Sequence, residues 1–250
     1  MGSAPAAVLS TARSSLRKLT SGGGAKEGAA AGAAPGKPVL YYYPGNASLS
    51  PHVVLRELGV PFELRLVDRE SNAQKDPAYL RINPNGYIPA LTDGELVLFE
   101  SAAIVMHLAD KYPKAALLPP VGSDARAHAV KWLFWLIPLQ SALMLYFYPE
   151  KYHSDEAAKA ELERVAQTKA AEMLKLLDAQ LGQGPWLIGA QYTVVDSFAW
   201  MLCRWTRSFE GTPAYGAAAG QLPHLRAWMT RMNERAAVKA TLEAEGSKPY

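Results

Sequence analysis

Cysteine is almost missing from this chain of 250 residues, which has Cys203 and no other. A single cysteine excludes an intramolecular disulfide and argues against a cysteine-based metal site. The histidines on predicted helices or at their ends lack metal-site spacing, so no metal is expected; they are His107, His128, His153 and His224.

Long apolar runs and a strong charge excess are missing too. The longest apolar candidate, residues 132–144, contains Pro138, Gln140 and Ser141 and is shorter than the roughly 18 residues of a membrane span, so no span is expected. Residues 1–37 hold five basic residues against one acidic residue, and the whole chain carries +3, so the remainder carries 3 − 4 = −1. This near-neutral remainder gives no reason to expect nucleic-acid binding.

Residues 1–37 differ in composition from the rest because they are rich in Ala, Gly and Ser and poor in acids. The stretch "AAVLSTARSSLRKL" is basic and Ser-rich with apolar residues on one helical face, a pattern typical of a mitochondrial or plastid transit peptide. A flexible basic tail is the alternative. We therefore expect a cytoplasmic protein, or a mitochondrial or plastid one if this extension is a transit peptide.

After the extension, predicted strands and helices alternate. The run "VLYYY" predicts a strand that ends in a turn at residues 44–45, and residues 51–58 predict a helix that Gly59 terminates. "FELRLV" alternates as a strand, "DPAYLRINPNG" indicates a short helix before a turn, and "IPALTDGELVLF" indicates a hairpin turning at residues 93–94. A helix over residues 100–112 completes the order βαβαββα.

The second half of the chain is helical in pattern. Three prolines in residues 113–123 predict a linker between two domains. We predict a small α/β domain over residues 38–112 and an all-helical domain over residues 124–246, with a ligand cleft between them. The first helix of the all-helical domain should break or kink near Pro138. The predicted helices cover residues 124–147, 155–181, 193–207, 222–233 and 236–244.

Short motifs stand in a definite order along this layout. They are "YYYPGNASLSPH" at residues 41–52, "NPNGYIPAL" at residues 83–91, the pair Glu100-Ser101, and "TVVD" at residues 193–196 with Gly189 before it. The "TVVD" spacing is that of a helix capping box, and we interpret it as structural. Together with the two-domain layout, the motifs resemble the soluble glutathione transferases from about residue 39 to residue 246. Bacterial members of the beta class resemble the first motif most.

The resemblance implies a thioredoxin-like N-terminal domain followed by an all-α domain, with glutathione as co-substrate and a small hydrophobic electrophile as second substrate. It implies a homodimer, and contacts from particular residues. Ile88 and a cis Pro89 are expected against the cysteinyl part of glutathione. Glu100 and Ser101 are expected at its γ-glutamyl end, where an acid suits the ammonium and a helix N-terminus suits the carboxylate. Tyr42 on the first strand is a further binding candidate.

The second substrate is expected against an apolar wall in the helical domain. The resemblance places Tyr43, Pro138, Ser141 and Trp205 in this electrophile pocket. The beta class carries a histidine near the position of Ser141, and this chain does not. Beta-class substrate preferences therefore do not carry over.

The thiol of glutathione reacts as a thiolate, so the protein needs a donor that favours the charged form. Beta-class members have Cys-Ser where this chain has Ala47-Ser48, so a mixed disulfide with glutathione is excluded there. Ser48 is the main predicted donor, with Asn46 and the strand tyrosines as alternatives. Ser50 directly precedes Pro51, the pattern of an N-cap, and this would leave Ser48 free to face the substrate.

The predicted function is a glutathione transferase that acts on small apolar electrophiles. The alternatives are a glutathione-dependent peroxidase, thiol reductase, isomerase or lyase on the same fold, or a non-catalytic binding module. Ring-cleavage isomerases usually show a Ser-Ser-Cys run after the first strand, which this chain lacks. The complete set of site residues argues against the module. His52 is expected to be structural.

Overall fold

The computed structural model describes residues 37–249, so the predicted transit peptide or tail lies almost wholly outside the described residues. A mixed four-stranded sheet has the order β2-β1-β3-β4, with β1 parallel to β2 and antiparallel to β3. β3 and β4 form the predicted hairpin. The strands are β1 (Val39–Tyr42), β2 (Glu63–Leu66), β3 (Ala90–Asp93) and β4 (Leu96–Phe99).

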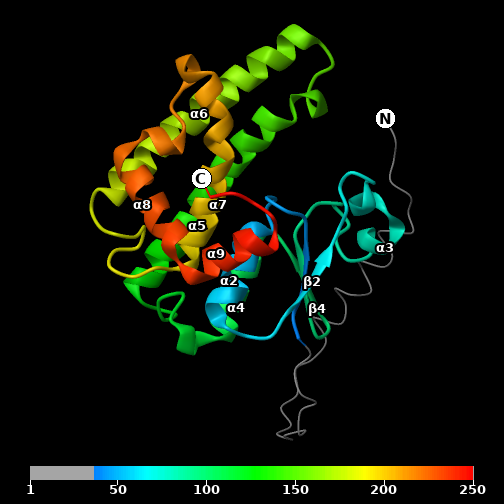
Figure 1. Cartoon of the computed structure of the whole chain (residues 1–250), viewed down its shortest axis with the longest axis vertical. Helices are drawn as coiled ribbons and strands as arrows, with labels where there is room; N and C mark the ends of the chain where they lie inside the picture. Colours follow the sequence, from blue (N-terminus) through cyan, green and yellow to red (C-terminus); the bar gives the residue numbers. More distant parts are fainter. Residues whose placement is uncertain (1–36, 250) are drawn as a thin grey trace, which may run out of the picture. The chain divides into compact units, whose positions relative to one another are not determined.

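Two helices of the small domain, α2 (Leu49–Leu58) and α4 (Ser101–Lys111), pack against each other on one side of the sheet, and α3 (Pro77–Leu80) lies on the other (Figure 1). Their apolar residues recur at helical spacing and are buried, which explains why these segments form helices. α2 ends where Gly59 adopts a left-handed φ of 64°, as the sequence predicts. The short 3-10 helix η1 (Ala73–Lys75) precedes α3.

The second half of the described chain is helical, and the predicted fold class is confirmed. α5 and α6 are long neighbours, and α7 is the central helix, with every residue from Val194 to Cys203 buried. The α-helices are α5 (Asp124–Phe147), α6 (Glu156–Leu181), α7 (Val194–Trp205), α8 (Pro223–Glu234) and α9 (Ala236–Ala244). The 3-10 helices are η2 (Pro113–Ala115), η3 (Pro149–Lys151), η4 (Thr206–Gly211), η5 (Pro213–Tyr215) and η6 (Ala219–Gln221).

α5 runs as one helix through Pro138, where the sequence predicts a break or a kink. Its first turn is capped by Ser123, whose hydroxyl accepts a hydrogen bond from the Arg126 N–H at 3.2 Å. By length and composition alone, α5 is the one helix of residues 37–249 that could cross a membrane. It packs against α6 and α7, and its buried side chains belong to the core of the helical domain.

The C-terminal helix α9 crosses back to the small domain and lies beside α2 (Figure 1). Arg235, just before α9, donates from Nε and Nη2 to the two carboxylate oxygens of Glu57 on α2, at 2.6 and 2.9 Å. The Arg235 guanidinium also lies 3.7 Å from the centre of the Tyr192 ring. A two-point ion pair against an aromatic ring holds its geometry well, so it fixes how α9 meets α2.

The predicted capping box at the start of α7 is confirmed. Asp196 is fully buried and accepts hydrogen bonds from the Thr193 N–H at 2.9 Å and the Thr193 hydroxyl at 3.1 Å. Its other oxygen accepts from the Leu187 N–H at 3.0 Å and from the Trp228 indole at 3.1 Å. One carboxylate therefore ties the loop before α7, α7 itself and α8 together.

Candidate active site

The turn between β1 and α2 carries most of the predicted catalytic residues, and the side chain of Ser48 closes it. The Ser48 hydroxyl donates to the Tyr43 carbonyl oxygen at 3.1 Å and accepts from the Tyr43 N–H at 3.3 Å. The Ser48 side chain is completely buried. Its hydroxyl is thus engaged with backbone groups on the other side of the turn.

The prediction that Ser50 caps α2 is wrong. α2 begins at Leu49, so Ser48 occupies the N-cap position, although its side chain does not cap the helix. Ser50 lies inside the first turn, where its hydroxyl is 3.0 Å from the Ser197 hydroxyl of α7, and Ser197 also donates to the Ser50 carbonyl oxygen at 3.1 Å. Ser50 is used to join the two domains, a contact that a local N-cap pattern does not reveal.

Asn46 lies at the surface end of the same turn. Its Oδ1 accepts the Ala47 N–H at 2.6 Å, and because a backbone N–H needs an acceptor, this contact fixes which end of the amide faces inward. The amide nitrogen of this partly buried residue makes no hydrogen bond within residues 37–249. Asn46 therefore presents an oriented N–H donor next to the N-terminus of α2.

Gly45, the residue before Asn46, is held by two side chains of the helical half. Its N–H donates to Glu245 Oε2 at 2.9 Å, and its carbonyl oxygen accepts from the Trp205 indole N–H at 3.0 Å. The φ of Gly45 is +70°, a left-handed conformation that glycine adopts without strain. Trp205, expected in the electrophile pocket, thus contacts the backbone of the turn between β1 and α2.

The other oxygen of Glu245 lies 2.8 Å from His52 Nδ1, and both side chains are fully buried. Arg56 donates from Nε to His52 Nε2 at 3.0 Å. Since Nε2 accepts this bond, the proton of the neutral ring is on Nδ1 and points at the carboxylate. His52 is structural, as expected. Glu245 was not predicted, because nothing in the sequence near residue 245 indicates a partner 200 residues earlier.

The predicted cis peptide bond between Ile88 and Pro89 is confirmed. The carbonyl oxygen of the preceding residue, Tyr87, accepts from the Tyr79 hydroxyl at 2.7 Å and from the Asn83 amide at 2.8 Å. These bonds explain why "NPNGYIPAL" occurs as a unit. Asn83 stabilises the turn that delivers Ile88 to the start of β3.

Glu100 and Ser101 lie at the start of α4, as the sequence predicts. Ser101 is buried, and its hydroxyl donates to the Ala47 carbonyl oxygen at 2.7 Å, so α4 is tied to the turn that contains Asn46 and Ser48. Glu100 is exposed and has a φ of 72°, unusual for a residue with a side chain. The N–H groups of the first turn of a helix lack partners in the helix, and here they adjoin an exposed carboxylate.

The remaining predicted residues are more scattered. Tyr42 points inward, with its ring 6.2 Å from the His52 ring. The Tyr43 hydroxyl donates to Glu70 Oε1 at 3.4 Å. Partial removal from water and the Glu70 carboxylate raise the pKa of Tyr43, so its phenol stays protonated. Pro138 and Ser141 lie on an exposed part of α5, and the Ser141 hydroxyl donates to the Ile137 carbonyl oxygen at 3.1 Å.

Cys203 is completely buried in α7, and burial raises the pKa of its thiol. A buried, protonated thiol is a poor nucleophile, so this cysteine packs, as expected. No group of three or more His, Cys, Asp or Glu side chains placed to hold a metal occurs in residues 37–249.

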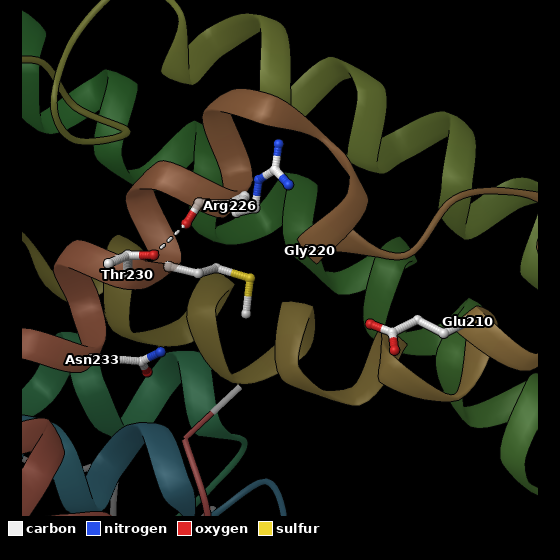
Figure 2. A pocket seen from close by; sticks show the side chains of 6 residues that line it. Glu210, Gly220, Arg226, Thr230 and Asn233 are labelled. Carbon is white, nitrogen blue, oxygen red and sulfur yellow. Dashed lines mark hydrogen bonds between the residues drawn. The ribbon is translucent and has the colours of Figure 1, made fainter.

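Two hollows in the helical half do not include any predicted site residue. Figure 2 shows one of them, in which Arg226 and Glu210 lie on opposite sides and Thr230 donates to the Arg226 carbonyl oxygen at 3.0 Å. It is lined by Glu210, Gly220, Arg226, Met229, Thr230 and Asn233. The other is lined by residues between 116 and 193, at the end of the interdomain linker.

Comparison with known proteins defines the class. Residues 38–110 match the glutathione S-transferase N-terminal domain, and residues 127–236 match the C-terminal domain. Glutathione S-transferase GstA of Escherichia coli O157:H7 is 31% identical over 214 residues, which are 84% of this chain and 99% of that protein. The chain therefore belongs to the glutathione S-transferase family and is an enzyme of that type.

Two solved structures agree with this assignment. A sphingomonad glutathione S-transferase in complex with glutathione is 31% identical, with a TM-score of 0.70, over 83% of this chain and 98% of that one. A bacterial beta class glutathione S-transferase of Sphingomonas chungbukensis is 30% identical, with a TM-score of 0.70 over the same shares of the two chains.

Proposed function

We propose that this protein transfers glutathione to small apolar electrophiles and holds the glutathione sulfur at the turn of residues 44–48. The observation that carries the proposal is the convergence on this turn of the Ser101 hydroxyl, the Trp205 indole and the Glu245 carboxylate. Three side chains from distant parts of the chain hold one short turn in place, and an oriented amide, that of Asn46, is left unbonded on it. Rigid support around a free donor is what a thiolate-binding site requires.

The proposed chemistry needs a thiolate and no general base. A free thiol has a pKa of about 8.5. A hydrogen bond to a charged sulfur contributes roughly 1.5–3 kcal/mol, and a helix N-terminus contributes about 0.3–1 kcal/mol. At about 1.4 kcal/mol per unit, these terms lower the thiol pKa by about 1 to 3 units. The thiol proton goes to water, the sulfur then bonds to the electrophilic carbon, and the leaving group departs with its electron pair.

We assign the donor role to Asn46, with the N-terminus of α2 beside it. Ser48 is then a positioning residue, since its buried hydroxyl already bonds the Tyr43 backbone in both directions. This reverses the order of preference that the sequence suggests, and the proposed site is of an amide type. The motif resembles that of the beta class except at Ala47, where no thiol is available for a mixed disulfide.

Glutathione itself is proposed to lie along the small domain. Ile88 offers backbone groups beside the cis bond to Pro89, and the first turn of α4 at Ser101 offers N–H groups to the γ-glutamyl carboxylate. Glu100 is exposed and suits the ammonium. The Tyr42 ring packs against the His52 ring, at 6.2 Å between centres. We assign the electrophile to the part of the site beside Tyr43 and α5. A cytoplasmic detoxification role fits this chemistry.

Replacing each of the two donor candidates, Asn46 and Ser48, by alanine tests the assignment. We expect Asn46→Ala to raise the pKa of the bound thiol and to lower turnover of an aryl halide about tenfold below that pKa, since a hydrogen bond to thiolate is lost. The ultraviolet absorbance of the thiolate, titrated in the enzyme saturated with glutathione, reports this pKa directly. Ser48→Ala serves as the matched variant and should mainly lower the free energy of unfolding, because the Tyr43 N–H loses its acceptor.

The opposite pattern, a raised thiol pKa in Ser48→Ala and none in Asn46→Ala, would return the donor role to Ser48. Retention on immobilised glutathione separates an enzyme from a binding module. A wild-type protein that neither binds the matrix nor turns over aryl halides, peroxides or mixed disulfides would contradict the proposed function as a whole.

We also propose a homodimer. Leu96, Val97 and Phe99 on the edge strand β4, and Phe134 on α5, are each more than a third exposed. An apolar edge strand is normally covered in a stable protein. We expect Phe134→Glu to shift the protein from dimer to monomer in light scattering, whereas Val121→Glu, on the exposed linker, leaves the dimer intact. A wild-type protein that is monomeric would contradict this proposal.

A further inference from the structure

Residues 246–249, the last that the structure describes, leave α9 and run back along the end of α7 (Figure 1). We call them the strap. Gly246 ends α9 with a left-handed φ of 59°, and the Ser247 N–H donates to the Leu242 carbonyl oxygen at 2.8 Å. These are features of the Schellman motif, which satisfies the last carbonyl groups of a helix and sets the direction in which the chain leaves it. The course of the strap is therefore set by α9 itself.

Two arginines near the end of α7 hold the strap by its backbone. Arg204 donates from Nη2 to the Lys248 carbonyl oxygen at 2.8 Å, and Arg207 of η4 donates from Nη2 to the Pro249 carbonyl oxygen at 2.7 Å. The Arg204 guanidinium lies over the Trp200 ring, 4.9 Å from its centre. A planar guanidinium stacked on an aromatic ring has few other orientations open to it, so Arg204 holds the strap in one place.

The strap lies against the turn that we assign to the glutathione sulfur. Glu245, the residue before the strap, accepts the Gly45 N–H at 2.9 Å. Ser247 Oγ lies 4.0 Å from the position that a Cβ on Gly45 would occupy. Trp205, next to Arg204 on α7, donates to the Gly45 carbonyl oxygen at 3.0 Å. The same end of α7 therefore holds both the turn and the strap.

The charge of Arg204 makes it depend on the strap in turn. Burial and the like charge of Arg207 lower the pKa of Arg204 to about 10, while the Glu245 carboxylate opposes this change, so the side chain is charged at neutral pH. Its Nη1 atom is buried and has no hydrogen-bond partner within the part of the chain that the structure describes. A charge that is largely removed from water is costly unless polar groups meet it. The Lys248 carbonyl oxygen and the nearby Glu245 carboxylate meet this one, which ties Glu245, and with it Gly45, to α7.

Resting on the proposed function, we propose that Arg204 is a positioning residue for the thiolate donor, Asn46, and acts on it through the strap. With Arg204 in place, Glu245 and Trp205 hold the N–H and the carbonyl oxygen of Gly45, so the peptide that leads to Asn46 has one orientation. Without Arg204, the strap is held only by α9 and η4, and the Glu245 carboxylate gains freedom. The Asn46 amide then meets the sulfur less often in a bonding geometry, which weakens glutathione binding and favours the neutral thiol.

Hydrogen exchange tests the coupling between Arg204 and the turn and needs no ligand. Arg204→Met keeps the apolar contact with Trp200 and loses the charge and the donor. In this variant the Gly45 N–H should exchange about tenfold faster than in the wild type, the change expected when one hydrogen bond of a charged group is lost. Mass spectrometry of the peptide that covers residues 43–49 follows this exchange. Arg204→Gln, a milder change, is measured in the same way if Arg204→Met does not fold.

Arg231→Met is the matched control. Arg231 on α8 also donates to a backbone carbonyl oxygen, that of Pro185 at 2.7 Å, and its guanidinium lies 5.6 Å from the centre of the Trp186 ring. These contacts hold the loop before α7, so the Gly45 N–H should exchange as in the wild type. Unchanged exchange at Gly45 in the Arg204 variant, or an equal increase in the Arg204 and Arg231 variants, overturns the inference.

Glutathione affinity and the pKa of the bound thiol separate positioning from a merely structural role. Arg204→Met should weaken calorimetric binding of glutathione about fivefold, which is about 1 kcal/mol at 1.4 kcal/mol per factor of ten, and should raise the thiol pKa in ultraviolet titration. Arg231→Met should change neither. Faster exchange at Gly45 with unchanged affinity and thiol pKa overturns the inference. Neither measurement needs an electrophile, so a wild type that binds glutathione and converts no electrophile overturns the proposed function alone, whereas one that binds no glutathione overturns both.

Discussion

Glu245→Ala should lower the free energy of unfolding by about 2–5 kcal/mol, because two buried donors lose their acceptor and each unsatisfied buried group costs about 1–3 kcal/mol. The substitution leaves the His52 Nδ1 proton and the Gly45 N–H without acceptors in a fully buried place. For a chain of this size, the melting temperature should fall by about 10 °C. KM for glutathione should rise as well, because Gly45 precedes Asn46 and loses one of its two supports.

Glu243→Ala is the control for this prediction, since Glu243 lies two residues earlier, at the end of the same helix, and is exposed. It should unfold like the wild type, within about 0.5 kcal/mol. Thermal unfolding followed by circular dichroism, together with KM for glutathione measured at a temperature where both variants are folded, decides the matter. A Glu245→Ala protein as stable as Glu243→Ala would show that the buried pair contributes little.

Asp196→Ala should be at least as destabilising, by about 3 kcal/mol or more. Its removal leaves the Leu187 N–H, the Thr193 N–H and the Trp228 indole without acceptors, and each unsatisfied buried group costs about 1–3 kcal/mol. Asp155→Ala is the matched control, because Asp155 caps α6 through the Ala158 N–H at 2.9 Å while remaining exposed. A solvent-exposed cap contributes only about 1 kcal/mol.

The two aspartate substitutions should differ in stability and not in activity. Denaturant titration is expected to show the larger loss for Asp196→Ala, with the activity per folded molecule unchanged. We interpret the Asp196 carboxylate as structural, so a variant that folds normally and has lost its activity would refute this interpretation.

The raised pKa of Asp196 also predicts how the stability of the protein depends on pH. Burial raises its pKa to about 6, and the hydrogen bonds from Leu187, Thr193 and Trp228 offset part of that rise. Because the pKa is higher in the folded protein than the unfolded value of about 3.9, the contribution of this group to stability is complete below about pH 4 and is lost as the pH rises through 6. Relative to Asp196→Asn, the wild type should therefore lose about 3 kcal/mol between these limits.

Local sequence patterns predicted the elements of this fold well. Gly59 ends α2 in a left-handed conformation, and the box from Thr193 to Asp196 starts α7. The β3–β4 hairpin forms as predicted, but Asp93 pairs with Leu96, so the turn is at residues 94–95, one residue later than the sequence predicts. Each of these features depends on a few neighbouring residues whose backbone needs are the same in any context. At Pro138 the break that the sequence allows for does not occur, and α5 continues through the proline while packing against α6 and α7.

The candidate site was only partly accessible from the sequence. The turn at residues 44–48, the cis bond at Pro89 and the start of α4 at Ser101 were all located. The hydrogen-bond partners of these segments are not evident from the sequence. The local pattern predicts Ser50 as a helix cap, whereas its hydroxyl bonds that of Ser197, 147 residues later. A hydroxyl can satisfy a nearby backbone group or a distant side chain equally well, and a local pattern does not distinguish them.

By itself, the sequence determined the order of strands and helices, the division into an α/β and an all-helical half, and the short stretches that a glutathione site needs. Periodic burial and turn chemistry act over a few residues, so they can be recognised without a structure. Only the tertiary structure decided that Ser48 is buried, that Glu245 and Trp205 hold Gly45, and that Arg204 holds the strap at Lys248. These contacts join residues up to 200 positions apart, and packing alone brings them together.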